Sequence, residues 1–149
     1  MALLILSRAE AVRSVLAEIK HVPGVVETGT ARDVKAALAK AINVPAVFAL
    51  YDGGRSKGRT THNTRGQNID LDISLIVVTE DYFNEENAHL GALQLLDTLC
   101  DHVTGFVPTT CKKPLEYVRD DFVIQNGERV AYEAFFSTRA EAFLGPRPA

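Results

Sequence analysis

The 149-residue sequence contains no tryptophan, one methionine and only two cysteines, Cys100 and Cys111. The cysteines form no CxxC pair. Cys100 falls on the apolar side of a predicted helix, where a buried thiol is favoured over a disulfide partner. Cys111 lies beside Lys112 and Lys113, whose positive charges favour the thiolate, so a reactive thiol is one interpretation of this position.

Long apolar runs are also missing, and none approaches the length needed to span a bilayer. The N-terminal Met1–Arg8 is apolar but has neither a basic leader nor a small-residue cleavage site, so it is a poor signal peptide. Acids outnumber bases by 19 to 16, a net charge of −3. That balance argues against general binding to nucleic acid or membranes, although it leaves room for a local basic patch. We therefore expect a cytoplasmic, single-domain protein.

Catalytic motifs are scarce. No histidine pair has the HExxH spacing, and no serine sits in a nucleophile elbow. Gly53–Thr60 approaches a phosphate-binding P-loop, but Arg59 stands where the motif needs lysine. No predicted helix follows, so the loop would lack the amide donors of a helix N-terminus. We expect no catalytic residue, no metal ligand set and no cofactor.

The most informative stretch is Ile69–Thr79, a strand in which apolar residues occupy every second position. Its other face begins with Asp70, Asp72 and Ser74 and then becomes apolar, as in a strand that runs from solvent into the middle of a sheet. Asp70 and Asp72 point the same way and could hold a divalent cation. The favoured interpretation is that they solubilise the exposed end, because no third acid is placed nearby.

The other elements follow from periodicity and turn signals. Ser7 to Glu10 has the spacing of a capping box, and Leu93, Leu96 and Leu99 are expected in the core. The predicted elements are a helix from near the N-terminus to Lys20, a strand at Val25–Gly29, a helix at Ala31–Ile42 capped by Thr30, a strand at Ala46–Tyr51 and a helix at Glu86–Thr104.

Two segments are predicted to be irregular. Gly53–Asn68 contains no acid and no large aliphatic side chain. It is expected to be a long basic loop, either a mobile hairpin tip or a partner-binding arm. The chain from about Ala140 is expected to form a loose tail. The basic residues of the loop are Arg55, Lys57, Arg59 and Arg65.

The C-terminal part predicts a hairpin around Asn126-Gly127. A three-residue loop, Gln125 to Gly127, avoids a clash between Asp120 and Glu133 and places the apolar residues on one face. That face would hold Val118, Phe122, Ile124, Val130, Tyr132, Ala134 and Phe136. The opposite face mixes charge with aromatics, which suits a subunit interface; it would hold Tyr117, Arg119, Asp121, Arg129, Glu133 and Phe135.

Together these elements predict an α+β domain with an antiparallel or mixed sheet of about four to five strands. Two to three helices are expected to pack on one face of the sheet.

Five short segments are informative together: Pro45-Ala-Val-Phe48, Gly91–Asp97, Val118-Arg-Asp120, Tyr132-Glu133 and Thr138-Arg139. In these segments the sequence resembles the bacteriophage tail terminator (tail-completion) family, in particular the type found in Mu-like contractile-tailed phages. The resemblance spans most of the chain and contains no catalytic motif.

The resemblance implies a structural, non-enzymatic protein of the virion tail, assembled in the host cytoplasm. Such proteins form rings, usually hexamers, on the end of a finished tail tube. Its implied partners are further copies of itself, tube and sheath proteins, head–tail connector proteins and, in passing, the DNA in the lumen, but no membrane.

Two alternatives stay open. A small nucleic-acid-binding module would use the basic loop on phosphates, against which stand the acidic net charge and the lack of interleaved aromatics. A metal-dependent enzyme would use Asp70 and Asp72, and a metal titration would separate it from both binding hypotheses.

Overall fold

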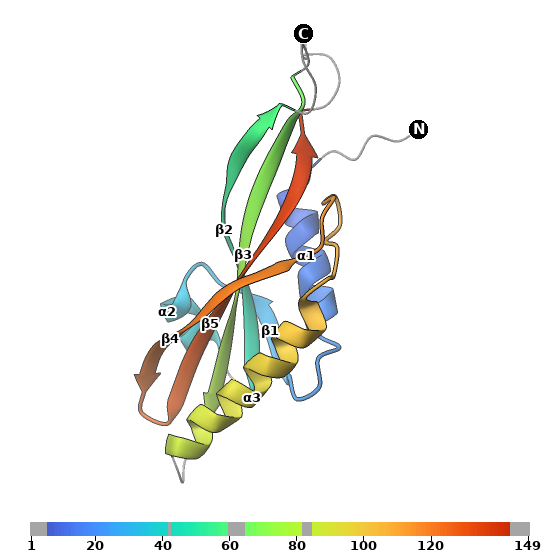
Figure 1. Ribbon diagram of the computed structural model, residues 1–149. Coiled ribbons are helices and arrows are strands. Elements are labelled where there is room, and N and C mark those ends of the chain that lie inside the picture. The colour runs from blue at the N-terminus through green and yellow to red at the C-terminus, as the bar shows by residue number, and fades with distance from the viewer. Residues whose placement is uncertain (1–5, 42, 60–64, 82–84, 144–149) are drawn as a thin grey trace.

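The computed structural model describes residues 6–41, 43–59, 65–81 and 85–143. It contains one five-stranded sheet in the order β1-β2-β3-β5-β4 (Figure 1). β1 runs parallel to β2, and the other neighbours are antiparallel, so the predicted α+β domain with a mixed sheet is confirmed. The elements are α1 (Arg8–Ile19), β1 (Glu27–Thr30), α2 (Val34–Lys40), β2 (Ala46–Arg59), β3 (Gln67–Glu80), α3 (Glu85–Val103), β4 (Glu116–Asn126) and β5 (Arg129–Ala142).

β3 is the middle strand, and its two faces differ as the sequence predicts. The face that carries Ile69, Leu71 and Ile73 is buried from Ile69 to Thr79. On the other face Asp70 and Asp72 are only half-buried, whereas Ser74 and the apolar residues beyond it are buried. The strand therefore passes from a half-solvated sheet into a sheet covered on both sides.

Helices cover both faces, so the prediction that they pack on one face is wrong. α1 and α3 share a core with Val47, Leu75 and Phe136. α2 packs on the opposite face, over Phe48 and Ile76. The physical reason lies in β3, because a strand that is apolar on both faces needs a layer on each side. None of the helices in the described ranges has the length and apolar character to cross a membrane.

The sequence predicts the N-cap of α1 correctly but not that of α2. Ser7 caps α1, and its hydroxyl accepts a hydrogen bond from the Glu10 amide at 3.3 Å. α2, by contrast, is capped by Asp33, whose carboxylate accepts from the Ala36 amide at 2.8 Å. Thr30 is not the cap because it ends β1. Both side chains suit an N-cap, so residue type alone does not choose between them.

The predicted basic loop is mostly strand. β2 continues to Arg59 and pairs with β3, with Arg55 opposite Asp70. The acids that pair with these basic side chains lie on β3, so the composition of the segment itself does not reveal them. Residues 60–64, the rest of the predicted loop tip, lie outside the described residues.

The predicted loose tail is also partly strand. β5 extends to Ala142, and both Ala140 and Ala142 are buried. Residues 144–149 lie outside the described part of the chain.

α3 lies where the sequence places it, but its buried stripe is rotated. Leu96 and Leu99 are buried as predicted, whereas Leu93 is 39% exposed and Leu95 takes its place in the core. Leucines surround more than half of this helix, so its sequence does not reveal which arc meets the sheet.

The C-terminal hairpin has a two-residue turn, Gly127-Glu128, closed by the pair Asn126–Arg129. The three-residue loop is therefore wrong. Register shifts at Val118 and Val123 insert an extra residue in β4 at each place and invert the alternation locally.

The inserted residues redistribute the two predicted faces. Phe122 and Phe136 share the face that α1 and α3 cover, and they share one face as predicted, because Phe122 pairs with Tyr132 and Phe136 with Tyr117. Tyr117 therefore lies on this α1/α3 face instead of the opposite one. Ile124 pairs with Ala131 and lies on the α2 face, so its predicted face is also wrong. Of the predicted buried residues, Val118 and Phe122 are more than half exposed.

Replacing Gly127 by alanine is expected to lower the free energy of unfolding by about 1 kcal/mol, measured by urea denaturation. Gly127 has φ +63°, in the left-handed region, and an added Cβ would touch nothing, so the cost is backbone strain alone. Gly91→Ala is the control: Gly91 lies within α3 with open space around it, and the change should stabilise. Equal effects of the two substitutions would contradict the turn geometry.

Candidate functional site

β4 forms one edge of the sheet and carries apolar side chains on both faces. Tyr117 is 46% exposed, Val118 56% and Phe122 52%. An edge strand presents unpaired backbone groups, and proteins usually blunt or cover such an edge when it is apolar. The edge around β4 is therefore the first candidate for a docking surface.

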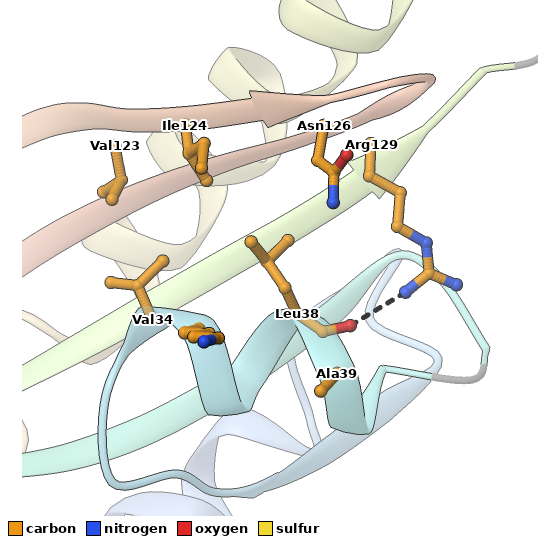
Figure 2. Close-up of a pocket in the computed structure, with 8 residues that line it drawn as sticks. Val34, Leu38, Ala39, Val123, Ile124, Asn126 and Arg129 are labelled. Atoms are coloured by element: carbon orange, nitrogen blue, oxygen red, sulfur yellow. Dashed lines mark hydrogen bonds between the residues drawn. The ribbon is translucent and has the colours of Figure 1, made fainter.

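A groove of about 550 Å³ lies between α2 and the β4–β5 hairpin (Figure 2). Val34 and Leu38 of α2 face Val123 and Ile124 across it. The groove is lined mainly by aliphatic side chains, and it extends the exposed apolar surface of β4 onto the α2 side of the sheet. The edge strand and the groove thus form one continuous surface.

Arg129 closes one end of this groove and is engaged within the chain. Its guanidinium donates to the carbonyl oxygens of Leu38 at 3.1 Å and Ala41 at 2.7 Å, and its Nε lies 3.3 Å from Glu80 Oε2. The last carbonyls of a helix have no partner within the helix, so Arg129 ties the C-terminal end of α2 to the hairpin. This internal role occupies a residue that the sequence placed at a subunit interface.

The polar half of the sheet forms a second depression, of about 560 Å³, beside the groove. Arg119 lies 4.0 Å above the ring of Phe135 and forms an ion pair with Asp121. Glu133 lies on the same face, opposite Asp121 in the β4–β5 ladder. Four of the six predicted interface residues are thus brought together here. Tyr117 packs on the other face, with its ring centroid 6.1 Å from that of Phe136.

Asp52 and Glu133 flank the buried Ser74 in this depression, and Asp52 is not among the predicted site residues. The Ser74 hydroxyl donates to Glu133 Oε2 at 2.7 Å. Burial raises the pKa of both carboxyls, and their mutual repulsion raises that of Glu133 further, whereas Ser74 and Arg119 act against the shift. The sequence feature that could have pointed to this depression is Ser74, a polar residue in the stretch where β3 becomes apolar.

The pKa of Asp70 is shifted in the opposite direction to those of Asp52 and Glu133. Arg139 Nε donates to its Oδ1 at 2.8 Å, and Lys57 lies 3.7 Å from its Oδ2. The hydrogen bond from Arg139 lowers the pKa of Asp70 below its ordinary value, and nearby positive charge adds to that effect. Ionised Asp70 therefore stabilises the fold at neutral pH.

Glu133→Gln and Asp70→Asn should shift the melting temperature at pH 7 in opposite directions. Ionised Glu133 opposes folding because its pKa is raised, so Gln, which still accepts from Ser74, should stabilise. Asp70 contributes stability above its unfolded pKa, and that contribution is lost as pH falls through its lowered folded pKa; Asn should destabilise. Thermal melts from pH 3 to 8 measure both changes, and shifts of the same sign would contradict the assigned environments.

The basic residues of the predicted loop are partly neutralised within the subunit. Arg55 lies 3.3 Å from Asp72, and Lys57 pairs with Asp70. Arg65 is half-buried, and the side chain of Arg59 lies outside the description. Paired cations have less charge to offer phosphates, which weakens the nucleic-acid alternative.

The same ion pairs occupy the carboxylates of the metal-enzyme alternative. Asp70 and Asp72 face arginine and lysine side chains instead of further oxygen ligands. Within the described ranges, no group of three or more histidine, cysteine, aspartate or glutamate residues could hold a metal ion.

Cys111 is buried, and burial raises the pKa of its thiol, so the structure argues against the interpretation of Cys111 as a reactive thiol. Lys112, one of the two basic neighbours, forms an ion pair with Glu141. Both cysteines are free, and Cys100 is half-buried as a packed thiol.

A family model described as "Phage tail terminator protein" matches residues 7–142. The chain belongs to the phage tail terminator family. It is therefore a structural protein of phage tails, which favours a non-enzymatic role; the Mu-like type stays a prediction.

A solved structure titled "Virion of native gene transfer agent (GTA) particle" contains a chain with a similar fold. The TM-score is 0.52 at 11% identity, over 90% of this chain and 91% of that one. At this identity the likeness shows the fold alone. A search of curated proteins found no match.

Proposed function

We propose that this chain assembles as a ring, a hexamer by resemblance to its family, on the end of a finished tail tube. There it stops polymerisation of tube and sheath and provides the surface to which the head joins. Family membership over residues 7–142 carries the proposal. The uncovered β4 edge supports it, because a lone subunit leaves several large apolar side chains in water.

The β4 side of each subunit is the proposed ring contact. Arg119, Asp121, Glu133 and Phe135 lie on one face of this edge, and Tyr117 lies on the other. Arg119 and Asp121 already neutralise each other within the subunit, so the contact can bury them with little unpaired charge. Arg129 contributes indirectly, because it holds α2 and the hairpin at the groove.

The far end of the sheet is the proposed contact with other tail components. β2, β3 and β5 project together beyond α3, and α1 lies beside them (Figure 1). This end carries Arg55, Lys57, Arg59 and Arg65, which a ring would repeat around its rim. The proposed partners are tube, sheath and head–tail connector proteins, with passing contact to DNA in the lumen. The contribution of these charges should weaken with salt.

Tails assembled with and without this protein test the proposal. Electron microscopy should show tails of uncontrolled length in its absence, and normal tails that join heads when the purified protein is added. Light scattering with and without tail tubes measures ring formation. Normal tails in its absence, together with a strict monomer that never associates with tubes, would rule out the terminator function.

A further inference from the structure

Two furrows lie beside the layer formed by α1 and α3, one at each edge of the sheet. The first, of about 490 Å³, lies between α3 and the edge strand β4. Leu96, Cys100 and Tyr117 supply its less polar part. Asp97, Asp101 and Asp120 supply its charge, and no basic residue in the described part of the chain lines it.

The negative potential of this acidic furrow contributes to raised pKa values of two groups in it, Tyr117 and Cys100. The Tyr117 hydroxyl donates to Asp120, and this bond with the surrounding acids raises the pKa of Tyr117 to about 12. Burial, followed by the charges of Asp120 and Asp97, raises the pKa of Cys100 to about 11. The furrow therefore favours positive charge on whatever docks in it.

The second furrow, of about 330 Å³, lies between α1 and strands β1 and β2. Val12, Leu16 and Tyr51 supply its apolar part, and Arg8 and Arg13 supply its charge. Among the residues that the structure describes, no acid lines this furrow. Arg8 Nε donates to the Tyr51 hydroxyl at 2.9 Å, and Arg8 is an exposed residue, so its positive charge is accessible at the furrow.

Arg13 is an accessible charge of this basic furrow. Its side chain is 72% exposed and pairs with Glu10 of its own helix, a pair of the weak surface kind.

The two furrows carry opposite charges, and each combines its charged residues with less polar side chains. A symmetric contact that set one furrow against itself would oppose aspartates to aspartates or arginines to arginines. Because the furrows lie at opposite edges, one partner copy cannot fill both at once. A contact that joins the acidic furrow of one copy to the basic furrow of the next satisfies both and leaves a free furrow at each end. It therefore adds copy after copy, and it forms a closed ring when the rotation between neighbours divides a full turn.

We propose that the acidic α3–β4 furrow binds the basic α1 edge of a second copy of this chain, as a head-to-tail contact. Asp97, Asp101 and Asp120 of one copy face Arg8 and Arg13 of the next. The contact is continuous with the exposed β4 edge, since Tyr117 belongs to both. This proposal rests on the proposed ring and specifies which two surfaces of the subunit form it.

A charge-exchange experiment tests the pairing. The variant Arg8→Glu/Arg13→Glu has acid at both edges, and Asp97→Arg/Asp101→Arg has base at both edges. Like charges at the contact should weaken self-assembly of each variant by roughly 100-fold. An equimolar mixture should regain assembly, because alternating copies restore opposite charges at every contact. Sedimentation velocity, alone and with tail tubes, measures all three, and melting temperatures verify that each variant is folded.

Lys113→Glu and Glu128→Lys are the controls, because both side chains are exposed and lie outside the two furrows. They should assemble like the unmodified protein. Variants that still assemble alone, or a mixture that stays dissociated, would overturn the pairing while leaving tail capping intact. If the unmodified protein fails to cap tails, the proposed function fails instead, whatever the furrows do.

Discussion

Replacing Phe136 by alanine is expected to lower the free energy of unfolding by about 3–5 kcal/mol. Phe136 is the largest fully buried side chain in the described part of the chain, 1% exposed, and it lies on β5 under the layer formed by α1 and α3. Its removal costs the transfer free energy of the ring and leaves a cavity between two rigid layers. Neighbouring side chains cannot fill it without moving a helix or the central strands.

Urea denaturation with a fluorescence or circular dichroism signal measures this loss. Phe122→Ala is the matched control, because Phe122 is the same residue type on the same face but is 52% exposed. It should cost about 1 kcal/mol, mainly from its ring contact with Tyr132 at 5.5 Å. A similar cost for both residues would mean that the helical layer does not cover β5 as described.

Replacing Arg129 by methionine should lower the free energy of unfolding by about 2–4 kcal/mol. The Glu80 side chain, 10% exposed, loses its cation and keeps a charge that is costly to bury alone. The carbonyl oxygens of Leu38 and Ala41 also lose their donor, so α2 should detach from the hairpin before the rest unfolds. Methionine keeps much of the apolar stem, so the loss reports on the charge and the hydrogen bonds.

Hydrogen exchange distinguishes this local effect from a global one. The amides of α2 should lose protection in Arg129→Met, whereas those of α3 should keep theirs relative to the global stability. Adding Glu80→Gln should recover part of the loss, because it removes the unpaired charge. Arg55→Met, which breaks an exposed pair with Asp72, should cost less than about 1 kcal/mol. Equal losses for Arg55 and Arg129 would contradict the clamp.

The sequence alone determined what depends on neighbours within a few residues. The alternation of β3 revealed its two faces, the Ser7 cap located the start of α1, and the leucine periodicity located α3. Local rules suffice there, because strand and helix periods are fixed by the backbone and a capping hydroxyl reaches only its own first turn. They also led to the α+β class.

Only the tertiary structure decided what depends on distant partners. β2 and β5 extend through segments predicted to be irregular, because ladder partners on β3 satisfy their backbone. Two inserted residues in β4 invert its faces, which no periodicity reveals, so the interface residues were only partly assigned. Arg55, Lys57 and Arg129 look like free cations in the sequence, yet each faces an acid from another strand. Such pairs form across the chain, and their free energy exists only once the sheet brings their charges together.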